Sequence, residues 1–148
     1  FTLVEIMIVV AIIALITAIA IPAFLQYRMD SQDSLYMNQL RIMRDAVKAY
    51  NIRTGTYPPN VGSGICPAGM SNYYATLDWS LDTPIGGRWN WDRNFLGAVA
   101  AVAVVGPDRT TAEMKRIDEV IDDGNLTAGH FQQVSFSAGS ERYQYRIE

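Results

Sequence analysis

An uninterrupted stretch of 22 uncharged residues, from Ile6 to Tyr27, dominates the N-terminal part of this 148-residue chain. As an α-helix, this stretch spans about 33 Å, which matches the hydrocarbon thickness of a bilayer. It does not resemble a secretory signal, which has a shorter apolar run and a small-residue cleavage site. A helix that is apolar on all faces is solvated by lipid or by copies of itself. We therefore predict a helix that spans a membrane or packs among identical helices.

The apolar residues of the chain are concentrated in this segment. The whole chain is 49% apolar, as in a soluble domain, but 21 of its first 25 residues are apolar. The chain has 12 basic and 15 acidic side chains, of which only Glu5 precedes Arg28. We therefore predict a hydrophobic transmembrane or filament-core helix over residues 1–28, an amphipathic helix over 29–54 that continues into a head, and a globular head over 55–148.

Charge and composition exclude several classes of function. The net charge of −3 and the absence of a Lys/Arg cluster provide no electrostatic attraction to nucleic acid. Cys66 alone forms neither an intrachain disulfide nor a thiolate zinc site, and His130 alone cannot build a multi-histidine metal centre. No group of residues suggests catalysis, so we expect that this protein is not an enzyme.

Glu5 is the one carboxylate at the start of the apolar segment. An ionised carboxylate in a membrane helix costs several kcal/mol unless it is paired. The α-amine of Phe1 in the same chain is about 6 Å away along the helix axis. The amine of a neighbouring copy, shifted along the helix, is a better partner. We therefore predict that Glu5 pairs with Phe1 between subunits.

A short N-terminal motif identifies a family. The motif is the run FTLVEIMIVV at residues 1–10, followed by Ala-Ile-Ile-Ala and by Ile21-Pro22. About 30 residues here resemble the mature N-terminus of bacterial type IV pilins and type II secretion pseudopilins. The resemblance implies that a prepilin peptidase removes a leader just before Phe1, and that the new amine is methylated.

The same resemblance implies a life cycle and a set of partners. The precursor is held in the bacterial inner membrane, and an assembly machine then extrudes it into an extracellular helical filament on the cell surface. The principal partner is another copy of the chain, and Glu5 faces the Phe1 amine of the adjacent subunit. When the apolar helix moves from lipid into a bundle of identical helices, it exchanges one apolar environment for another. This transfer is physically consistent with the implied cycle.

Pro22 lies inside the apolar helix. Proline has no amide hydrogen to donate, and its ring obstructs the preceding turn of a helix. We therefore expect a kink or a melted segment at Pro22.

Beyond Arg28 the sequence predicts an amphipathic helix. Its apolar residues are spaced 4, 3, 4 and 3 apart, which places them on one stripe: Tyr36, Leu40, Met43, Val47 and Tyr50. We expect this stripe to pack on a sheet. Gly55 and Pro58-Pro59 end the helix.

The head is predicted to combine strands with one short helix. Residues 55–94 predict a long loop, and the apolar run from Phe95 to Val105 predicts a central strand that is covered on both faces. Thr110 and Glu113 match a capping box for a helix of about 12 residues, which Gly124 would stop.

The C-terminal segment predicts a β-hairpin. Residues 132–137 and 141–148 flank Ala138-Gly139-Ser140, which is a turn signal. Tyr143 and Tyr145 alternate with Arg142, Gln144 and Arg146, so we expect the tyrosines to pack on the long helix and the polar residues to face solvent or a neighbour. Together these elements predict an α+β, pilin-like fold: a long N-terminal helix packed on an antiparallel sheet of about three strands.

Trp89 and Trp91 belong to the most aromatic stretch of the head. Their spacing places both rings on the same face of an extended segment. Three interpretations follow: the rings cover the core, form a sugar- or surface-binding platform, or lie in a subunit interface.

Four acids crowd the end of the predicted short helix: Asp118, Glu119, Asp122 and Asp123. The helix dipole favours cations at this end, so the acids need a compensating environment. They are solvated, paired with Arg142 or Arg146, or bound to calcium, for which the candidate ligands are Asp118, Asp122 and Asp123. Their spacing differs from the EF-hand pattern.

The sequence therefore supports two functions of different kinds. The first is a structural subunit that polymerises through its N-terminal helix into a type IV pilus-like filament. The second is a minor or tip pilin, or a pseudopilin, that serves as a binding or secretion-associated module whose Trp-rich loop recognises a ligand. Adhesion, motility, secretion and DNA uptake are all compatible with either form.

Overall fold

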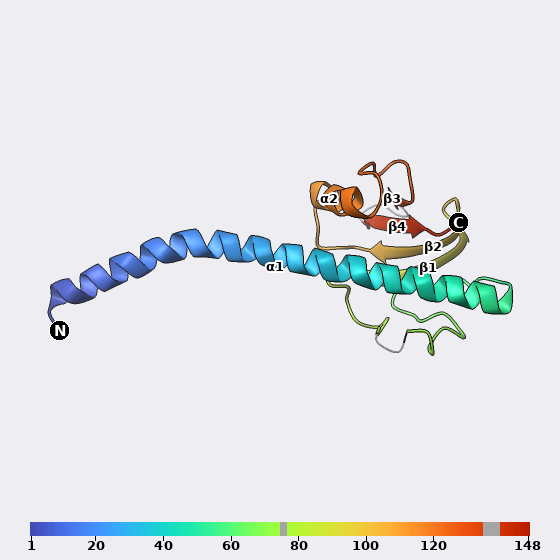
Figure 1. Cartoon of the computed structure of the whole chain (residues 1–148), viewed down its shortest axis with the longest axis horizontal. Helices are drawn as coiled ribbons and strands as arrows, with labels where there is room; N and C mark the ends of the chain where they lie inside the picture. The colour runs from blue at the N-terminus through green and yellow to red at the C-terminus, as the bar shows by residue number, and fades with distance from the viewer. Residues whose placement is uncertain (75–76, 135–139) are drawn as a thin grey trace. The chain divides into compact units, whose positions relative to one another are not determined.

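The computed structural model describes residues 1–74, 77–134 and 140–148. Contacts divide the chain into two units, Phe1–Gln32 and Asp33–Glu148. The elements run in the order α1 (Leu3–Thr54), β1 (Arg88–Phe95), β2 (Ala98–Val105), α2 (Thr111–Ile121), β3 (Phe131–Gln133) and β4 (Arg142–Arg146) (Figure 1).

The first unit is formed by the N-terminal part of α1. Every large apolar side chain from Phe1 to Leu25 is at least 51% exposed in the single chain. The helix continues without a break through Pro22, so the single chain contains no melted segment there. Unwinding at Pro22 remains a prediction for an assembled filament.

The second unit contains a four-stranded antiparallel sheet in the order β1-β2-β4-β3 (Figure 1). This sheet and the long helix confirm the predicted α+β, pilin-like fold, with one strand more than expected. The additional strand is β1, which lies in the region predicted to be a loop. β2 occupies the interior position expected for the central strand, and most of its residues are buried.

The predicted start of the central strand is wrong. Phe95 ends β1, and Leu96 and Gly97 form the turn that leads into β2 at Ala98. The backbone takes positive φ angles of 51° at Asn94, 48° at Leu96 and 79° at Gly97, which reverse the chain. A tight turn inside an apolar run leaves no polar punctuation in the sequence, so the run reads as one strand.

The core lies between the C-terminal half of α1 and one face of the sheet. The predicted stripe is confirmed, since four of its residues are buried in the core cluster and Tyr50 packs against that cluster. The ring of Tyr36 stacks on Trp89 with centroids 5.1 Å apart and planes 3° from parallel. Trp91 donates a hydrogen bond from Nε1 to the carbonyl of Pro58 at 3.1 Å. The buried tryptophans thus join the sheet to both the helix and the segment that follows it.

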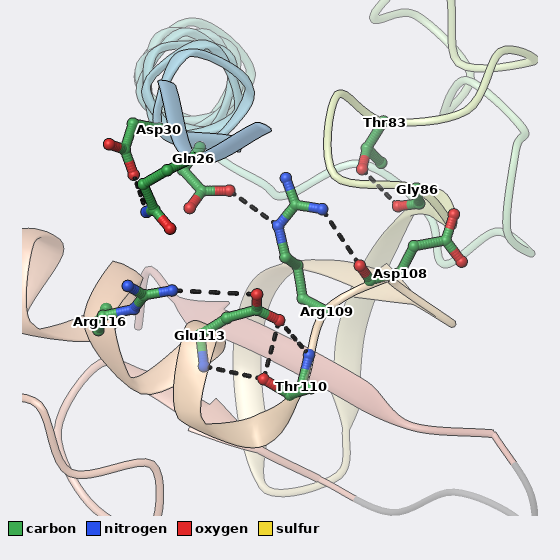
Figure 2. Close-up of polar contacts among 10 residues, drawn as sticks. Gln26, Asp30, Thr83, Gly86, Asp108, Arg109, Thr110, Glu113 and Arg116 are labelled. Carbon is green, nitrogen blue, oxygen red and sulfur yellow. Dashed lines mark hydrogen bonds and ion pairs between the residues drawn. The ribbon is translucent and has the colours of Figure 1, made fainter. Parts of the chain in front are cut away.

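Helix α2 begins with the predicted capping box, which Figure 2 shows. Glu113 accepts a hydrogen bond from the amide of Thr110 at 2.8 Å, and the hydroxyl of Thr110 accepts one from the amide of Glu113 at 3.3 Å. Just before the helix, Arg109 forms an ion pair with Asp33 at 3.0 Å, which links α2 to α1 within the second unit. The helix ends at Ile121, and Gly124 follows with a φ of 75°. The predicted short helix is therefore confirmed.

Strands β3 and β4 form the predicted C-terminal antiparallel pair. A turn is expected at Ala138-Gly139-Ser140. Of these three residues, Ser140 alone is among the described residues. Tyr143 is buried in the core cluster, and Tyr145 packs against it, as predicted for this face.

The opposite face of the sheet corrects a prediction. The sequence predicts that Arg142 and Gln144 face solvent or a neighbour, but these residues are 5% and 0% exposed. The turn between β1 and β2 contacts this face, where Gln144 donates to the carbonyl of Leu96 at 3.4 Å and Arg142 lies over the ring of Phe95. Arg142 also forms a buried ion pair with Asp92. The alternation along β4 correctly predicts that Arg142 and Gln144 share one face of the sheet. The turn that covers this face lies far away in the sequence, so the alternation does not reveal that the face is buried.

Candidate functional site

The N-terminus of α1 carries a capping box of its own. Glu5 Oε2 accepts hydrogen bonds from the amide of Thr2 at 2.6 Å and from its hydroxyl at 3.0 Å. The hydroxyl of Thr2 in turn accepts a hydrogen bond from the amide of Glu5 at 3.3 Å. In this reciprocal arrangement, side chains satisfy two backbone amides that the helix itself leaves without partners.

Glu5 is therefore partnered within its own chain. No ion pair between its carboxylate and the amine of Phe1 is present among the described residues, so the predicted pairing between subunits remains a prediction. The sequence contains a signal for the contact that does form, because Thr2-Leu3-Val4-Glu5 has the spacing of a capping box before an apolar run. The same spacing at Thr110 and Glu113 predicts the start of a helix, whereas the position of Glu5 as a lone carboxylate in an apolar segment favours a role between subunits.

The apolar surface of α1 is the largest candidate functional surface in the first unit. Helix α1 is long and apolar enough to cross a membrane. Its most apolar stretch of 18 residues has no buried residue in the described structure. Exposed apolar surface on this scale requires lipid or a partner protein. The predicted membrane or filament-core helix is thus consistent with the geometry.

A second candidate site lies where α2 ends. Asp118, Asp122 and Asp123 each place one carboxylate oxygen within 4.8 Å of the others. Asp122 caps α2, and its Oδ2 accepts hydrogen bonds from the amides of His130 and Phe131. These bonds tie the end of the helix to the start of β3. The structure therefore brings the three candidate calcium ligands together.

Asp118 is the exceptional member of this group. Its side chain is completely buried, and neither carboxylate oxygen has a hydrogen-bond partner. Burial, together with the charges of Asp123, Asp122 and Glu119, raises the pKa of Asp118 to about 6. The carboxyl of Asp118 therefore keeps its proton to a higher pH than an exposed aspartic acid does, and its charged form has no hydrogen bond to stabilise it.

The structure separates the three interpretations of these acids. A solvated face describes Glu119 and Asp123, which are exposed, but it does not describe Asp118, which has no exposed surface. Ion pairing with the predicted arginines is also wrong, because Arg142 pairs with Asp92, and Arg146 donates to the carbonyl of Gly97 and to Gln132. These contacts belong to the sheet, where the strand register places both arginines.

The predicted binding platform of Trp89 and Trp91 does not form. The two side chains are 2% and 0% exposed, so neither ring offers a surface to a ligand or to a neighbouring subunit in this conformation. The alternative that they cover the core is confirmed. Both belong to β1, whose alternation turns them toward α1 while Asn90 and Asp92 point to the other face.

Comparisons with known proteins identify relatives from bacterial pili. The fimbrial protein EcpC of Eikenella corrodens is 39% identical over 74 residues, or 49% of this chain and 48% of EcpC. The type IV major pilin protein PilE1 of Neisseria gonorrhoeae is 35% identical over 65 residues, or 44% of this chain and 30% of PilE1. The matches thus span about half or less of these relatives. No protein-family model and no solved structure matches the chain. The resemblance to type IV pilins is confirmed.

Proposed function

We propose that this chain, which is similar to type IV pilins, is a structural subunit that polymerises through its N-terminal helix into a type IV pilus-like filament. Its relatives are named as a fimbrial protein and a major pilin, which supports a pilus-subunit role. The fold consists of a long apolar helix joined to an α+β head and contains no arrangement that suggests catalysis in the described residues. We therefore propose a non-enzymatic function that is expressed by the polymer.

The exposed apolar surface of α1 is the observation that carries this proposal. Ile19, for example, is 76% exposed, and every large apolar side chain from Phe1 to Leu25 is at least 51% exposed. In a bilayer, lipid covers this surface, and in a filament, the same surface of other copies covers it. The subunit can therefore pass from the inner membrane to an extracellular filament on the cell surface, with help from prepilin peptidase and assembly machinery.

Glu5 supplies the charge that selects a register between subunits. Its hydrogen bonds to Thr2 leave a net negative charge in an apolar environment, and the charged amine of Phe1 on an adjacent copy would neutralise it. Hydrophobic surfaces alone permit many relative shifts of two helices, whereas a single ion pair permits one. N-methylation of Phe1 would retain this positive charge.

The test is a Glu5→Ala substitution in cells that assemble the filament. We expect the variant to accumulate in the membrane, because its helix remains apolar, and to yield few or disordered filaments in sheared surface material. Electron microscopy and immunoblots of membrane and surface fractions measure both quantities. Ordered filaments at the normal yield would refute the role of Glu5 in assembly.

The alternative function is that of a tip or secretion-associated binding module, and the described residues lack the exposed tryptophan surface on which this function depends. That interpretation depended on a Trp-rich surface, and both Trp89 and Trp91 are buried. Abundance still separates the two functions experimentally. A structural subunit dominates sheared surface material, whereas a tip protein is scarce in it.

A further inference from the structure

We propose that Asn125 is an acceptor for N-linked glycosylation, and that its side-chain nitrogen takes an oligosaccharide from a lipid-linked donor. Asn125, Leu126 and Thr127 match the Asn-x-Ser/Thr acceptor motif, in which the middle residue is not proline. Motifs of three residues are frequent, so the geometry of the loop decides whether this one can serve as an acceptor. Asn125 belongs to the second unit, so the modification is separate from the N-terminal segment that carries the proposed polymerisation.

The side chains of Asn125 and Thr127 hold each other in a defined geometry. Asn125 Oδ1 accepts a hydrogen bond from the hydroxyl of Thr127 at 2.7 Å and another from the amide of Thr127 at 3.2 Å. Because a backbone amide can only donate, these bonds establish which end of the Asn125 side chain is the oxygen. The side-chain nitrogen, Nδ2, has no hydrogen bond to any of the described residues. It is therefore available for reaction.

The two hydrogen bonds at Oδ1 suit the chemistry of transfer. The lone pair of an amide nitrogen is delocalised onto the oxygen, so Nδ2 is a weak nucleophile until a base removes one of its protons. Negative charge then collects on Oδ1, where the hydroxyl and the amide of Thr127 already donate. Donors that are in place before charge develops lower the barrier to the reaction. The hydroxyl of Thr127 therefore assists the reaction of Asn125 directly.

Leu126 anchors the acceptor loop to the core of the head. Its side chain is 8% exposed and belongs to the core cluster, and its carbonyl accepts a hydrogen bond from the amide of Gln133 in β3 at 2.8 Å. The carbonyl of Asn125 accepts from the amide of Ala128 at 2.9 Å, which closes a four-residue turn. Asn125 and Thr127, on either side of Leu126, are both exposed. The fold thus presents the two reactive side chains to solvent on a fixed turn, where an enzyme can reach them.

Two acids at the end of α2 hold the ends of this turn. Asp123 Oδ1 accepts a hydrogen bond from the amide of Asn125 at 2.8 Å. Asp122 Oδ2 accepts hydrogen bonds from the amides of His130 and Phe131, which follow the turn. These contacts involve backbone amides and leave the side-chain nitrogen of Asn125 unoccupied. The position of the acceptor is therefore determined by the head and does not depend on the sugar.

The reaction uses a polyprenyl diphosphate-linked oligosaccharide as the donor and a membrane-bound oligosaccharyltransferase as the catalyst. A bond forms between Nδ2 of Asn125 and the anomeric carbon of the donor sugar, and the bond between that carbon and the diphosphate oxygen breaks. The electron pair leaves with the polyprenyl diphosphate, and the proton from Nδ2 passes to a base of the transferase. This step rests on the proposed function, because a precursor anchored by its apolar helix is held at the membrane that contains the lipid-linked donor.

The experiment locates the mass added to the chain in membranes and sheared filaments of the cells that produce it. Trypsin cleaves after Arg116 and Arg142 and releases residues 117–142 as one peptide, which contains the whole motif. Electron-transfer fragmentation of this peptide is expected to place a mass of hexose or hexosamine units on Asn125, and Asn125→Gln should lose this mass completely. An unmodified Asn125, or the added mass on Thr127 instead, would overturn the proposal.

Two variants of Thr127 separate its role in the reaction from simple exposure of the loop. Thr127→Ser keeps the hydroxyl and should retain the glycosylated fraction within about twofold. Thr127→Val has a similar shape without the hydroxyl, and it should lower the glycosylated fraction by about tenfold or more, because a donor to Oδ1 is lost. Equal glycosylation of the two variants would refute the role of Thr127.

The yield of sheared filaments distinguishes failure of this proposal from failure of the proposed function. Asn125→Gln should fold and assemble, because Asn125 is exposed and lies outside the apolar surface of α1. Abundant filaments whose Asn125 is unmodified would overturn the glycosylation alone. A chain that is glycosylated at Asn125 but never enters filaments would support the glycosylation and contradict the proposed function.

Discussion

The carboxylate of Glu5 and the hydroxyl of Thr2 lie 3.0 Å apart, and each side chain also binds the backbone amide of the other residue. Glu5 thus fastens the first turn of α1 in the single chain. The same acid can serve a neighbouring subunit, because one carboxylate accepts several hydrogen bonds through its two oxygens. The local contact fixes the direction of the side chain before any subunit approaches.

Thr2→Val is predicted to separate these two roles of Glu5. The substitution removes the hydroxyl but retains the negative charge, so the helix should fray at its first turn at a cost of about 0.5–2 kcal/mol. Filaments should still form, because the ion pair between subunits remains. Hydrogen exchange at the amide of Glu5 and the yield of sheared filaments are the two measurements. If Thr2→Val prevented assembly as completely as Glu5→Ala, the capping contact rather than the charge would control polymerisation.

Glu113 is predicted to make the stability of the head depend on pH. Hydrogen bonds from the amide and hydroxyl of Thr110, and the charges of Arg109 and Arg116, hold the pKa of Glu113 below its usual value. A lowered folded pKa means that this stabilisation is complete above the unfolded pKa and is lost as pH falls through the folded pKa. Glu113→Ala should therefore cost about 0.5–1 kcal/mol in urea unfolding at pH 7 and less at pH 3.

Glu113→Gln is the matched control for this prediction. Glutamine keeps an acceptor for the amide of Thr110 but cannot titrate, so the stability difference between Glu113→Gln and Glu113→Ala should be the same at both pH values. A difference between the unsubstituted chain and Glu113→Ala that does not change between pH 7 and pH 3 would contradict the assignment.

The correct predictions concern contacts between residues close together in the sequence, and the incorrect ones concern contacts between residues far apart. The buried stripe from Tyr36 to Val47 and the capping box at Thr110 follow from residues three or four positions apart, which helical geometry brings together. The turn at Leu96 has only a weak local signal in Gly97, because an apolar residue adopts a positive φ beside that glycine. Tertiary contacts select that conformation, and short patterns do not record them.

The candidate sites show the same division. The acids after Asp118 are a visible cluster in the sequence, but the burial of Asp118 depends on how the loop before β3 folds over it. The spacing of Trp89 and Trp91 predicts that both lie on one face, and the stacking of Trp89 on Tyr36 shows that this face is internal. Periodicity identifies the faces of an element, whereas packing partners distant in sequence decide which face is buried.

The ion pair between Arg142 and Asp92 provides the last prediction, because both side chains are almost completely buried. Arg142→Met leaves a buried carboxylate without its cation and should cost about 3–5 kcal/mol in urea unfolding at pH 7. Burial already raises the pKa of Asp92, although Arg142 and Asn90 oppose this effect. Loss of Arg142 should raise the folded pKa further, so protonation would favour the folded state and the deficit should shrink as pH falls through that value. Asp92→Asn combined with Arg142→Met should be more stable at pH 7 than Arg142→Met alone, and a double variant that loses the sum of both single effects would refute the coupling.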